Sequence, residues 1–131
     1  MSEKLFALEK KGGSGKATFT LIGQKTIAST TAQSLTLDES IDNYKYLLFS
    51  MVSFDNDGGM VFKSTLFAYP MLALVPVSYF KSNSPLSTAW LSGSASNIVA
   101  RTCTITYVSD TSVTLKNDYT TSRTVYVYGL K

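Results

Sequence analysis

The chain has 131 residues, enough for one domain that buries its own core without metals or disulfides. Charged residues make up only 16% of it, below the roughly 25% usual for soluble proteins, and hydrophobic residues make up 44%. We therefore expect part of the apolar surface to be buried against other chains. The net charge of +3 is mild and the lysines are scattered, which argues against a nucleic-acid partner.

The chain contains no histidine. The commonest general base and metal ligand is therefore missing, and neither a Ser-His-Asp nor a Cys-His arrangement can form. Most of the nine acidic residues occupy predicted turns or caps, where local hydrogen bonds account for them. A glycosidase needs two carboxylates that face each other across a cleft, and sequence spacing does not reveal such a pair. We expect no enzymatic activity, no cofactor and no metal site.

Residues 1–16 are interpreted as a short N-terminal strand or arm that ends in a glycine-rich hinge, and residues 17–131 as a single domain. The glycine-rich Lys10–Lys16 segment fails the phosphate-loop template, because Ala17 follows the lysine and a strand pattern replaces the required helix. No signal peptide is visible at the N-terminus. The longest apolar stretch, Leu66–Val77, is interrupted by two prolines and is too short to span a bilayer, so we expect no membrane insertion.

Threonine, serine, valine, tyrosine and phenylalanine are abundant, and no long window has a helical apolar stripe, so the sequence predicts an all-β protein. Strands are expected over 17–22 and 25–30, with a turn at Gly23-Gln24. A short strand over 35–37 follows, and Asp38 is predicted to cap a single turn that ends at Ile41. From Tyr44 an almost unbroken apolar run predicts a strand covered on both faces, with Tyr44 packed at the corner.

The segment Asp55–Gly59 predicts a hairpin turn, with a return strand over 60–69. It also resembles the start of a calcium loop, but Leu66 stands where that loop needs its glutamate. A further strand is expected over 71–80, placed at an edge or at a bulge by Pro70 and Pro76. Polar loops are expected over 81–88 and 92–97.

Three alternating segments, 98–108, 112–116 and 123–130, predict strands near the C-terminus. Cys103 lies on the inward face of the first and is expected to be a small buried hydrophobe, with a reactive thiol as the alternative. Together the elements predict an antiparallel β-sandwich of jelly-roll-like type. Tyr126 and Tyr128 share a face opposite Val125 and Val127, which favours a second core or a subunit interface there.

Exposed aromatic rings beside amides are typical of carbohydrate sites. Trp90 lies between two predicted polar loops, and Tyr119 lies inside another. With Asn83 and Asn117 they are the candidate receptor-binding residues. For Trp90, burial is favoured over such a role, because tryptophan is usually highly buried.

Two segments carry a resemblance. The pattern from Leu35 to Tyr44, Leu-Thr-Leu-Asp-Glu-Ser-Ile-Asp-Asn-Tyr, precedes an apolar strand, and the chain ends Val127-Tyr128-Gly129-Leu130-Lys131. Both resemble segments of bacteriophage tail-fibre and receptor-binding proteins, and together they span about residues 33–131.

The resemblance implies a virion protein that is made in the host cytoplasm, forms a homotrimer and recognises a host-surface glycan or protein. The subunit interface is expected to include part of Met60–Phe80 or the Tyr126/Tyr128 face. A head-fibre, decoration or baseplate protein, attached to other virion proteins through residues 1–16, is the alternative.

Overall fold

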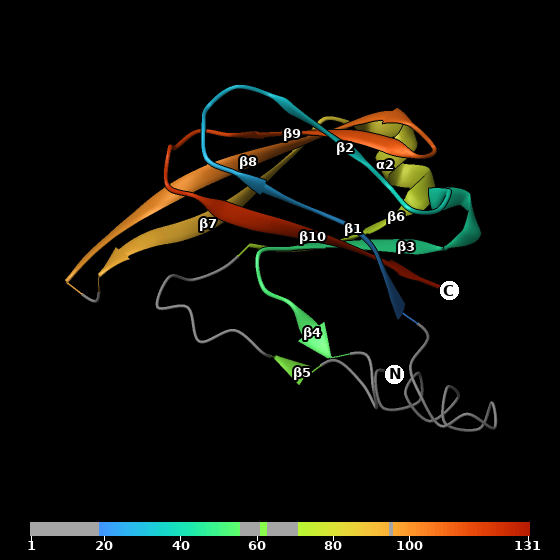
Figure 1. The fold of residues 1–131 in the computed structure, drawn as a ribbon, viewed down its shortest axis with the longest axis horizontal. Helices are drawn as coiled ribbons and strands as arrows, with labels where there is room; N and C mark the ends of the chain where they lie inside the picture. Colours follow the sequence, from blue (N-terminus) through green and yellow to red (C-terminus); the bar gives the residue numbers. More distant parts are fainter. Residues whose placement is uncertain (1–18, 56–60, 63–70, 95) are drawn as a thin grey trace.

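A computed structural model describes residues 19–55, 61–62, 71–94 and 96–131. The predicted antiparallel β-sandwich is confirmed, because two four-stranded antiparallel sheets pack face to face (Figure 1). The strands of sheet A lie in the order β1 (Phe19–Ile27), β10 (Arg123–Leu130), β3 (Tyr46–Ser50) and β6 (Leu72–Pro76). The strands of sheet B lie in the order β2 (Gln33–Thr36), β9 (Ser112–Asn117), β8 (Asn97–Ser109) and β7 (Leu86–Ser94). The N-terminal arm and its hinge, the tip of the 55–59 hairpin and most of the 60–69 strand lie outside the described residues.

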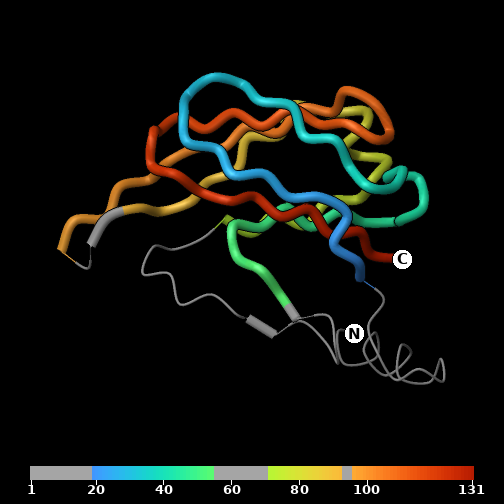
Figure 2. Tube along the Cα trace, in the orientation of Figure 1, coloured from blue at the N-terminus to red at the C-terminus, as the bar shows by residue number. Residues whose placement is uncertain are grey.

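The chain passes between the two sheets in a jelly-roll-like manner. It crosses from β1 to β2, back from β2 to β3, again at α2 (Val77–Asn83), and finally from β9 to β10, as the trace in Figure 2 shows. The short strands β4 (Phe54–Asp55) and β5 (Val61–Phe62) pair antiparallel, as the predicted hairpin requires. No helix in the described ranges is long and apolar enough to cross a membrane.

The core between the sheets follows the alternation of the C-terminal strands. Cys103 and Ile105 of β8 and Val125 and Val127 of β10 are completely buried, on the face predicted to point inward. Burial raises the pKa of the Cys103 thiol to about 11. Cys103 is therefore a buried hydrophobe, as expected, and not an activated nucleophile.

The prediction that β3 is covered on both faces is also confirmed. Leu47 and Phe49 point into the core between the sheets, whereas Leu48 points to the opposite face and packs with Phe19 and Tyr128. Phe54 packs against this second cluster, and its backbone N–H donates to the Tyr128 hydroxyl at 2.9 Å. The Tyr126/Tyr128 face thus forms a second, smaller core.

The predicted turn at Gly23-Gln24 is wrong, because β1 runs through it as one strand with a bulge between Leu21 and Gly23. A Cβ at Gly23 would lie 2.9 Å from Cδ2 of Leu37. The glycine therefore allows strand β1 to approach the second sheet closely, which is a common role of glycine within a strand.

The predicted strand over 71–80 is half wrong. β6 ends at Pro76, and the helix α2 follows, with Val77 and Phe80 buried three residues apart on one face. The predicted loop over 81–88 is replaced by the end of α2 and the start of β7, and the predicted loop over 92–97 by the tight β7–β8 turn. The edge position of β6 is confirmed.

The turn after β2 is capped by a different residue from the one predicted. The 3₁₀ turn η1 (Ile41–Asn43) has Ser40 as its N-cap, and the Ser40 hydroxyl accepts from the Asp42 N–H at 3.2 Å. Asp38 is exposed, and its own N–H donates to the Ile22 carbonyl at 2.7 Å. Tyr44 does pack at this corner, where it is buried and its hydroxyl donates to Glu39 Oε2 at 2.9 Å.

We expect Ser40→Ala to lower the free energy of unfolding by about 0.5–2 kcal/mol, the range for a lost N-cap. Asp38→Ala, two residues away and without a cap hydrogen bond, should change it by less than about 0.5 kcal/mol. Urea unfolding of both variants measures the difference. Equal losses, or a larger loss for Asp38→Ala, would contradict the assignment of the cap.

Candidate binding surfaces

The structure gathers three of the four predicted receptor-binding residues at one end of the sandwich. Trp90 lies on β7, and its Nε1 donates to Asn117 Oδ1 on β9 at 3.0 Å. Tyr119 follows in the connection to β10. Asn83 is separate, because it ends α2, which Figure 1 shows at the end of the sandwich opposite the β9–β10 connection.

The predicted exposure of Trp90 and Asn117 is wrong. Trp90 is 1% exposed and Asn117 is 0% exposed, so neither presents a surface to a sugar. Trp90 pairs in register with Arg101, two residues before the buried Cys103, and therefore lies on the inner face of sheet B. Burial, the favoured alternative for Trp90, is confirmed. The Nδ2 atom of Asn117 is buried and has no hydrogen-bond partner among the described residues.

Two arginines surround this tryptophan. The Arg101 guanidinium carbon lies 3.5 Å from the ring centroid of Tyr119, and Arg101 Nε donates to the Ser92 hydroxyl at 3.2 Å. The Arg123 guanidinium carbon lies 5.1 Å from the ring centroid of Trp90, within cation–π range. Neither arginine forms an ion pair with a carboxylate in the described part of the chain. We call Trp90, Arg101, Asn117, Tyr119 and Arg123 the arginine end.

Arg101 and Arg123 were not among the candidate binding residues predicted from the sequence, although the alternation of their strands indicates their position. Arg101 belongs to the inward row of Cys103 and Ile105, and Arg123 to the inward row of Val125 and Val127. A charged residue that extends an inward apolar row must lie where the row leaves the core. Both arginines do so at the same end of the molecule.

A cavity of about 290 Å³ lies beside Arg123. Its polar lining comes from Ser53, Ser122, Arg123, Thr124 and Tyr126, and its apolar lining from Met51 and Val52. The buried Ser50 hydroxyl fixes the adjoining corner, because it donates to the Val52 carbonyl at 2.7 Å and accepts from the Val52 N–H at 3.0 Å. The cavity wall is therefore held in place before any ligand binds.

The second surface is the side of sheet A that faces away from sheet B, which we call the outer face. Cross-strand pairing forms two neighbouring rows that are apolar or aromatic on all four strands. The rows are Leu21, Tyr128, Leu48, Leu74 and Phe19, Leu130, Tyr46, Pro76.

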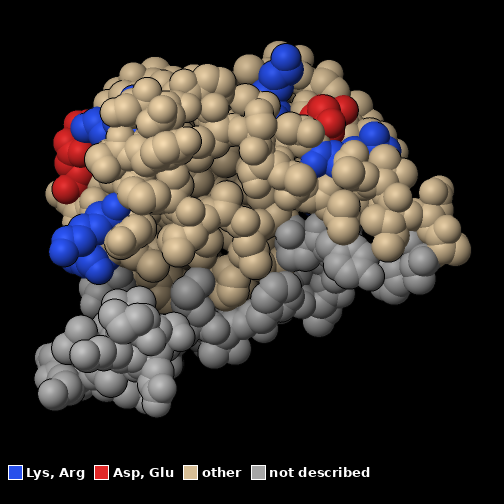
Figure 3. All heavy atoms as spheres, turned by 180° about the vertical axis from the view of Figure 1, so that it is seen from behind, with Lys and Arg blue, Asp and Glu red and all other residues tan. Residues whose placement is uncertain are grey.

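The outer face is covered unevenly. Phe19, Leu48 and Tyr128 are buried in the second core, but Leu74 is 61% and Leu72 is 52% exposed on the edge strand β6. On the side of the molecule seen from behind, charged side chains lie toward the two ends and uncharged side chains lie between them (Figure 3). An exposed apolar edge of this kind is typical of an interaction surface.

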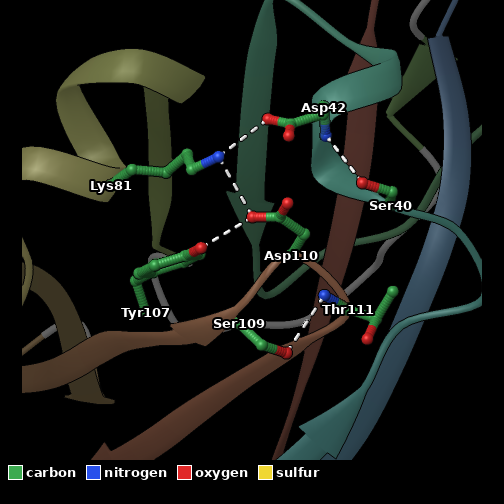
Figure 4. A network of polar contacts seen from close by, with 7 residues as sticks. All are labelled: Ser40, Asp42, Lys81, Tyr107, Ser109, Asp110 and Thr111. Atoms are coloured by element: carbon green, nitrogen blue, oxygen red, sulfur yellow. Dashed lines mark hydrogen bonds and ion pairs between the residues drawn. The ribbon is translucent and has the colours of Figure 1, made fainter.

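A polar network joins three elements at the end opposite the arginine end (Figure 4). Lys81 of α2 pairs with Asp42 Oδ1 at 2.9 Å and with Asp110 Oδ1 at 3.0 Å. The Tyr107 hydroxyl donates to Asp110 Oδ1 at 2.6 Å, and the Asp110 carbonyl accepts from the Ile41 N–H at 2.8 Å. Each charged group here has a partner, so we interpret the network as a structural link between α2, η1 and the β8–β9 turn.

This network predicts a dependence of stability on acid pH. The hydrogen bond from Tyr107, and then the one from Lys81, hold the pKa of Asp110 below its ordinary value of 3.8. The contribution of Asp110 to stability is thus complete above that value and disappears as the pH falls through the lower folded pKa. In urea unfolding at pH 7, the free energy of unfolding of wild type should exceed that of Asp110→Asn. This difference should disappear in strong acid. Asp38→Asn, outside the network, serves as control, and a pH-independent difference for Asp110→Asn would contradict the prediction.

No group of three histidine, cysteine, aspartate or glutamate side chains that would hold a metal occurs among the described residues. The arginine end, its adjoining cavity and the outer face of sheet A are therefore the surfaces on which a function can be argued. Comparison with models of known protein families, with curated proteins and with solved structures finds no match to this chain.

Proposed function

We propose that this chain is a bacteriophage virion protein of the tail-fibre or receptor-binding type, which assembles as a homotrimer and attaches to a host-surface glycan or protein. The β-sandwich is compatible with that role. The proposal rests on the two segments that resemble such proteins and on the apolar outer face of sheet A. We do not propose an enzymatic activity.

The two resembling segments form one structural unit, which supports treating them together. A Cβ at Gly129 would lie 2.5 Å from Cγ and Cδ2 of Tyr44, so the tyrosine ring rests directly on the glycine backbone. The Lys45 N–H donates to the Leu130 carbonyl at 2.8 Å, and Lys131 Nζ lies 5.7 Å from the centre of the Tyr44 ring. Each segment therefore provides the packing surface that the other one needs.

The assembly part of the proposal rests on the exposure of two leucines on β6: Leu74, which ends one of the apolar rows of the outer face, and Leu72, which lies beside it. An edge strand with exposed leucines invites pairing or stacking with another chain. A second copy is the occupant that we propose, because the resembling proteins are typically trimers.

We expect wild type to have the mass of a trimer in light scattering and Leu74→Arg to be monomeric at micromolar concentration, because a guanidinium cannot be buried unpaired in an apolar interface. Val108→Arg is the matched control, since Val108 is similarly exposed (56%, against 61% for Leu74) but lies on β8 of the other sheet. A monomeric wild type would contradict the assembly proposal, and an equal effect of both substitutions would contradict the choice of surface.

Competition with phage adsorption tests the attachment role. Purified protein at saturating dose should reduce adsorption of the phage that encodes it, because it occupies the receptor. No effect at saturation would overturn the attachment role and favour the alternative, a head-fibre, decoration or baseplate protein that contacts only other virion proteins. The apolar outer face is consistent with that alternative too. Release of reducing sugar from host envelope would instead indicate a glycosidase.

A further inference from the structure

We infer that the cavity beside Arg123 is a binding site for one acidic sugar residue, whose carboxylate pairs with the Arg123 guanidinium. The inference deepens the proposed function, on which it rests for its biological setting, by assigning a ligand class to one place on the molecule. The binding chemistry itself depends only on the described residues.

The first step is the state of the arginine. Arg123 has five N–H donors, of which one hydrogen bond is accounted for, from Nη1 to the Ser122 carbonyl at 2.8 Å. It has no carboxylate partner in the described ranges, and the ring of Trp90 fixes its position by a cation–π contact at 5.1 Å. Because Trp90 is completely packed in the core, Arg123 is a cation held on a rigid support with donors to spare.

The second step is the composition of the cavity. Hydroxyl groups of Ser53, Ser122 and Tyr126 line it, and none of them makes a hydrogen bond within the described part of the chain. The Thr124 hydroxyl is already engaged with Thr26 at 2.8 Å. Among the described residues, no acidic side chain lines the cavity, so none of them repels an anion there. A guanidinium with several free hydroxyls matches a ligand that carries one carboxylate and several hydroxyl groups.

The third step is size and apolar surface. A volume of about 290 Å³ lies at the lower end of the range of small-molecule pockets, roughly 300–1,000 Å³, and suits one sugar ring. The Tyr126 ring and the buried Met51 and Val52 supply apolar surface for the face of that ring.

A larger groove of about 640 Å³ at the other end of the sandwich is less suitable. Its Lys81 is already paired with Asp42 and Asp110, and its other lining cation, Lys45, is exposed to solvent. The Asp42 carboxylate also lines this groove and repels an anion, whereas the described lining of the smaller cavity contains an arginine and no carboxylate.

The test is a titration of the intact protein with sodium glucuronate, in which binding is measured by calorimetry or NMR. Glucose and inorganic phosphate are titrated separately as comparison ligands. We expect glucuronate to bind at least about tenfold more tightly than glucose, since a charge-assisted bidentate pair adds on the order of 1.4 kcal/mol or more. Phosphate should bind more weakly than glucuronate, because it makes no use of the hydroxyls or the apolar wall. Equal binding of glucose and glucuronate, or of phosphate and glucuronate, would overturn the inference.

Variants locate the site. Arg123→Gln should abolish the preference for glucuronate over glucose, and Arg123→Lys should restore part of it, since lysine keeps the charge but not the planar fork. Arg101→Gln is the matched control, because Arg101 stacks on Tyr119 and does not line the cavity. Thermal melts establish that each variant is folded, and Ser122→Ala, at an exposed position, provides a second cavity variant that should weaken glucuronate binding. Unchanged glucuronate binding in Arg123→Gln would refute the site.

The two proposals fail in different ways. Adsorption competition without glucuronate binding would remove the acidic-sugar site and leave the attachment role. Glucuronate binding that depends on Arg123, without any effect on adsorption, would support the site and remove the attachment role.

Discussion

Trp90→Ala should lower the free energy of unfolding by about 3–5 kcal/mol, the range for truncating a buried large aromatic residue. Trp90 closes one end of the core between the sheets and is among the largest fully buried side chains. Since a domain of this kind is stable by only about 5–15 kcal/mol, the variant should be partly unfolded or strongly shifted in its thermal melt. The receptor-binding hypothesis for Trp90 predicted the reverse, a surface residue whose loss spares stability, whereas the general tendency of tryptophan favoured burial.

The contribution of the indole N–H can be separated from that of the ring. Trp90→Phe keeps most of the apolar volume but removes the indole N–H that donates to Asn117 Oδ1. The other polar atom of that side chain, Nδ2, already lacks a hydrogen-bond partner among the described residues. Asn117 Oδ1 still accepts from the Asp118 N–H at 3.1 Å, so we expect a loss of about 0.5–1.5 kcal/mol for the missing hydrogen bond, the usual net contribution of one such bond. Tyr79→Ala, at an aromatic residue that is 53% exposed, is the control and should stay within about 0.5 kcal/mol. If the melting temperature of Trp90→Ala is as close to that of wild type as the melting temperature of Tyr79→Ala is, the buried position of Trp90 is contradicted.

Gly129→Ala is the second substitution with a large expected effect. The added methyl group would lie 2.5–2.7 Å from Cγ, Cδ1 and Cδ2 of Tyr44, which are ring atoms close to the backbone and unable to move away alone. The corner that carries Tyr44 is tied to β10 by the Lys45 N–H to Leu130 carbonyl hydrogen bond. We therefore expect a loss of about 3 kcal/mol, at the upper end of the usual cost of overpacking.

Gly23→Ala provides the matched control. Its methyl group would meet Cδ2 of Leu37 at 2.9 Å, the far end of a flexible side chain that can rotate, so we expect a loss of about 1 kcal/mol. Neither glycine has a positive φ, which makes the comparison one of packing and not of backbone strain. In a double-mutant cycle, Tyr44→Leu should reduce the cost of Gly129→Ala. If the two substitutions lower the free energy of unfolding independently, the Tyr44 ring is not what excludes a methyl group at Gly129.

Much of the fold was determined by the sequence itself. Strict alternation over 98–130 predicted β8, β9 and β10 nearly to the residue, because a two-residue period puts one set of side chains in the core whatever the partner strand is. The unbroken apolar run from Leu47 to Phe49 predicted the strand that is buried on both faces. The parity of Tyr126 and Tyr128 predicted either a second core or a subunit interface on their face, and the second core is present there.

Local turns were predicted less well, because several nearby residues have similar chemistry. Asp38 and Ser40 are both good caps, and the choice between them depends on where the Asp38 N–H finds its acceptor on β1. Gly23 has the composition of a turn, yet the approach of Leu37 from the other sheet makes it a bulge within one strand. The short helix α2 is too brief to produce a helical pattern in a long window.

The candidate site was decided by the tertiary structure. Sequence parity states which face of a strand a residue occupies, but not where the opposite sheet ends. Trp90 lies where sheet A still covers the inner face of β7, so it is buried, whereas Arg101 and Arg123 extend their inward rows to the end of that cover. Asn83 was grouped with Trp90 only because it is near in sequence, and α2 carries it to the other end of the sandwich. The alternation fixed the face of each residue, and the packing of the two sheets fixed which of those residues a ligand can reach.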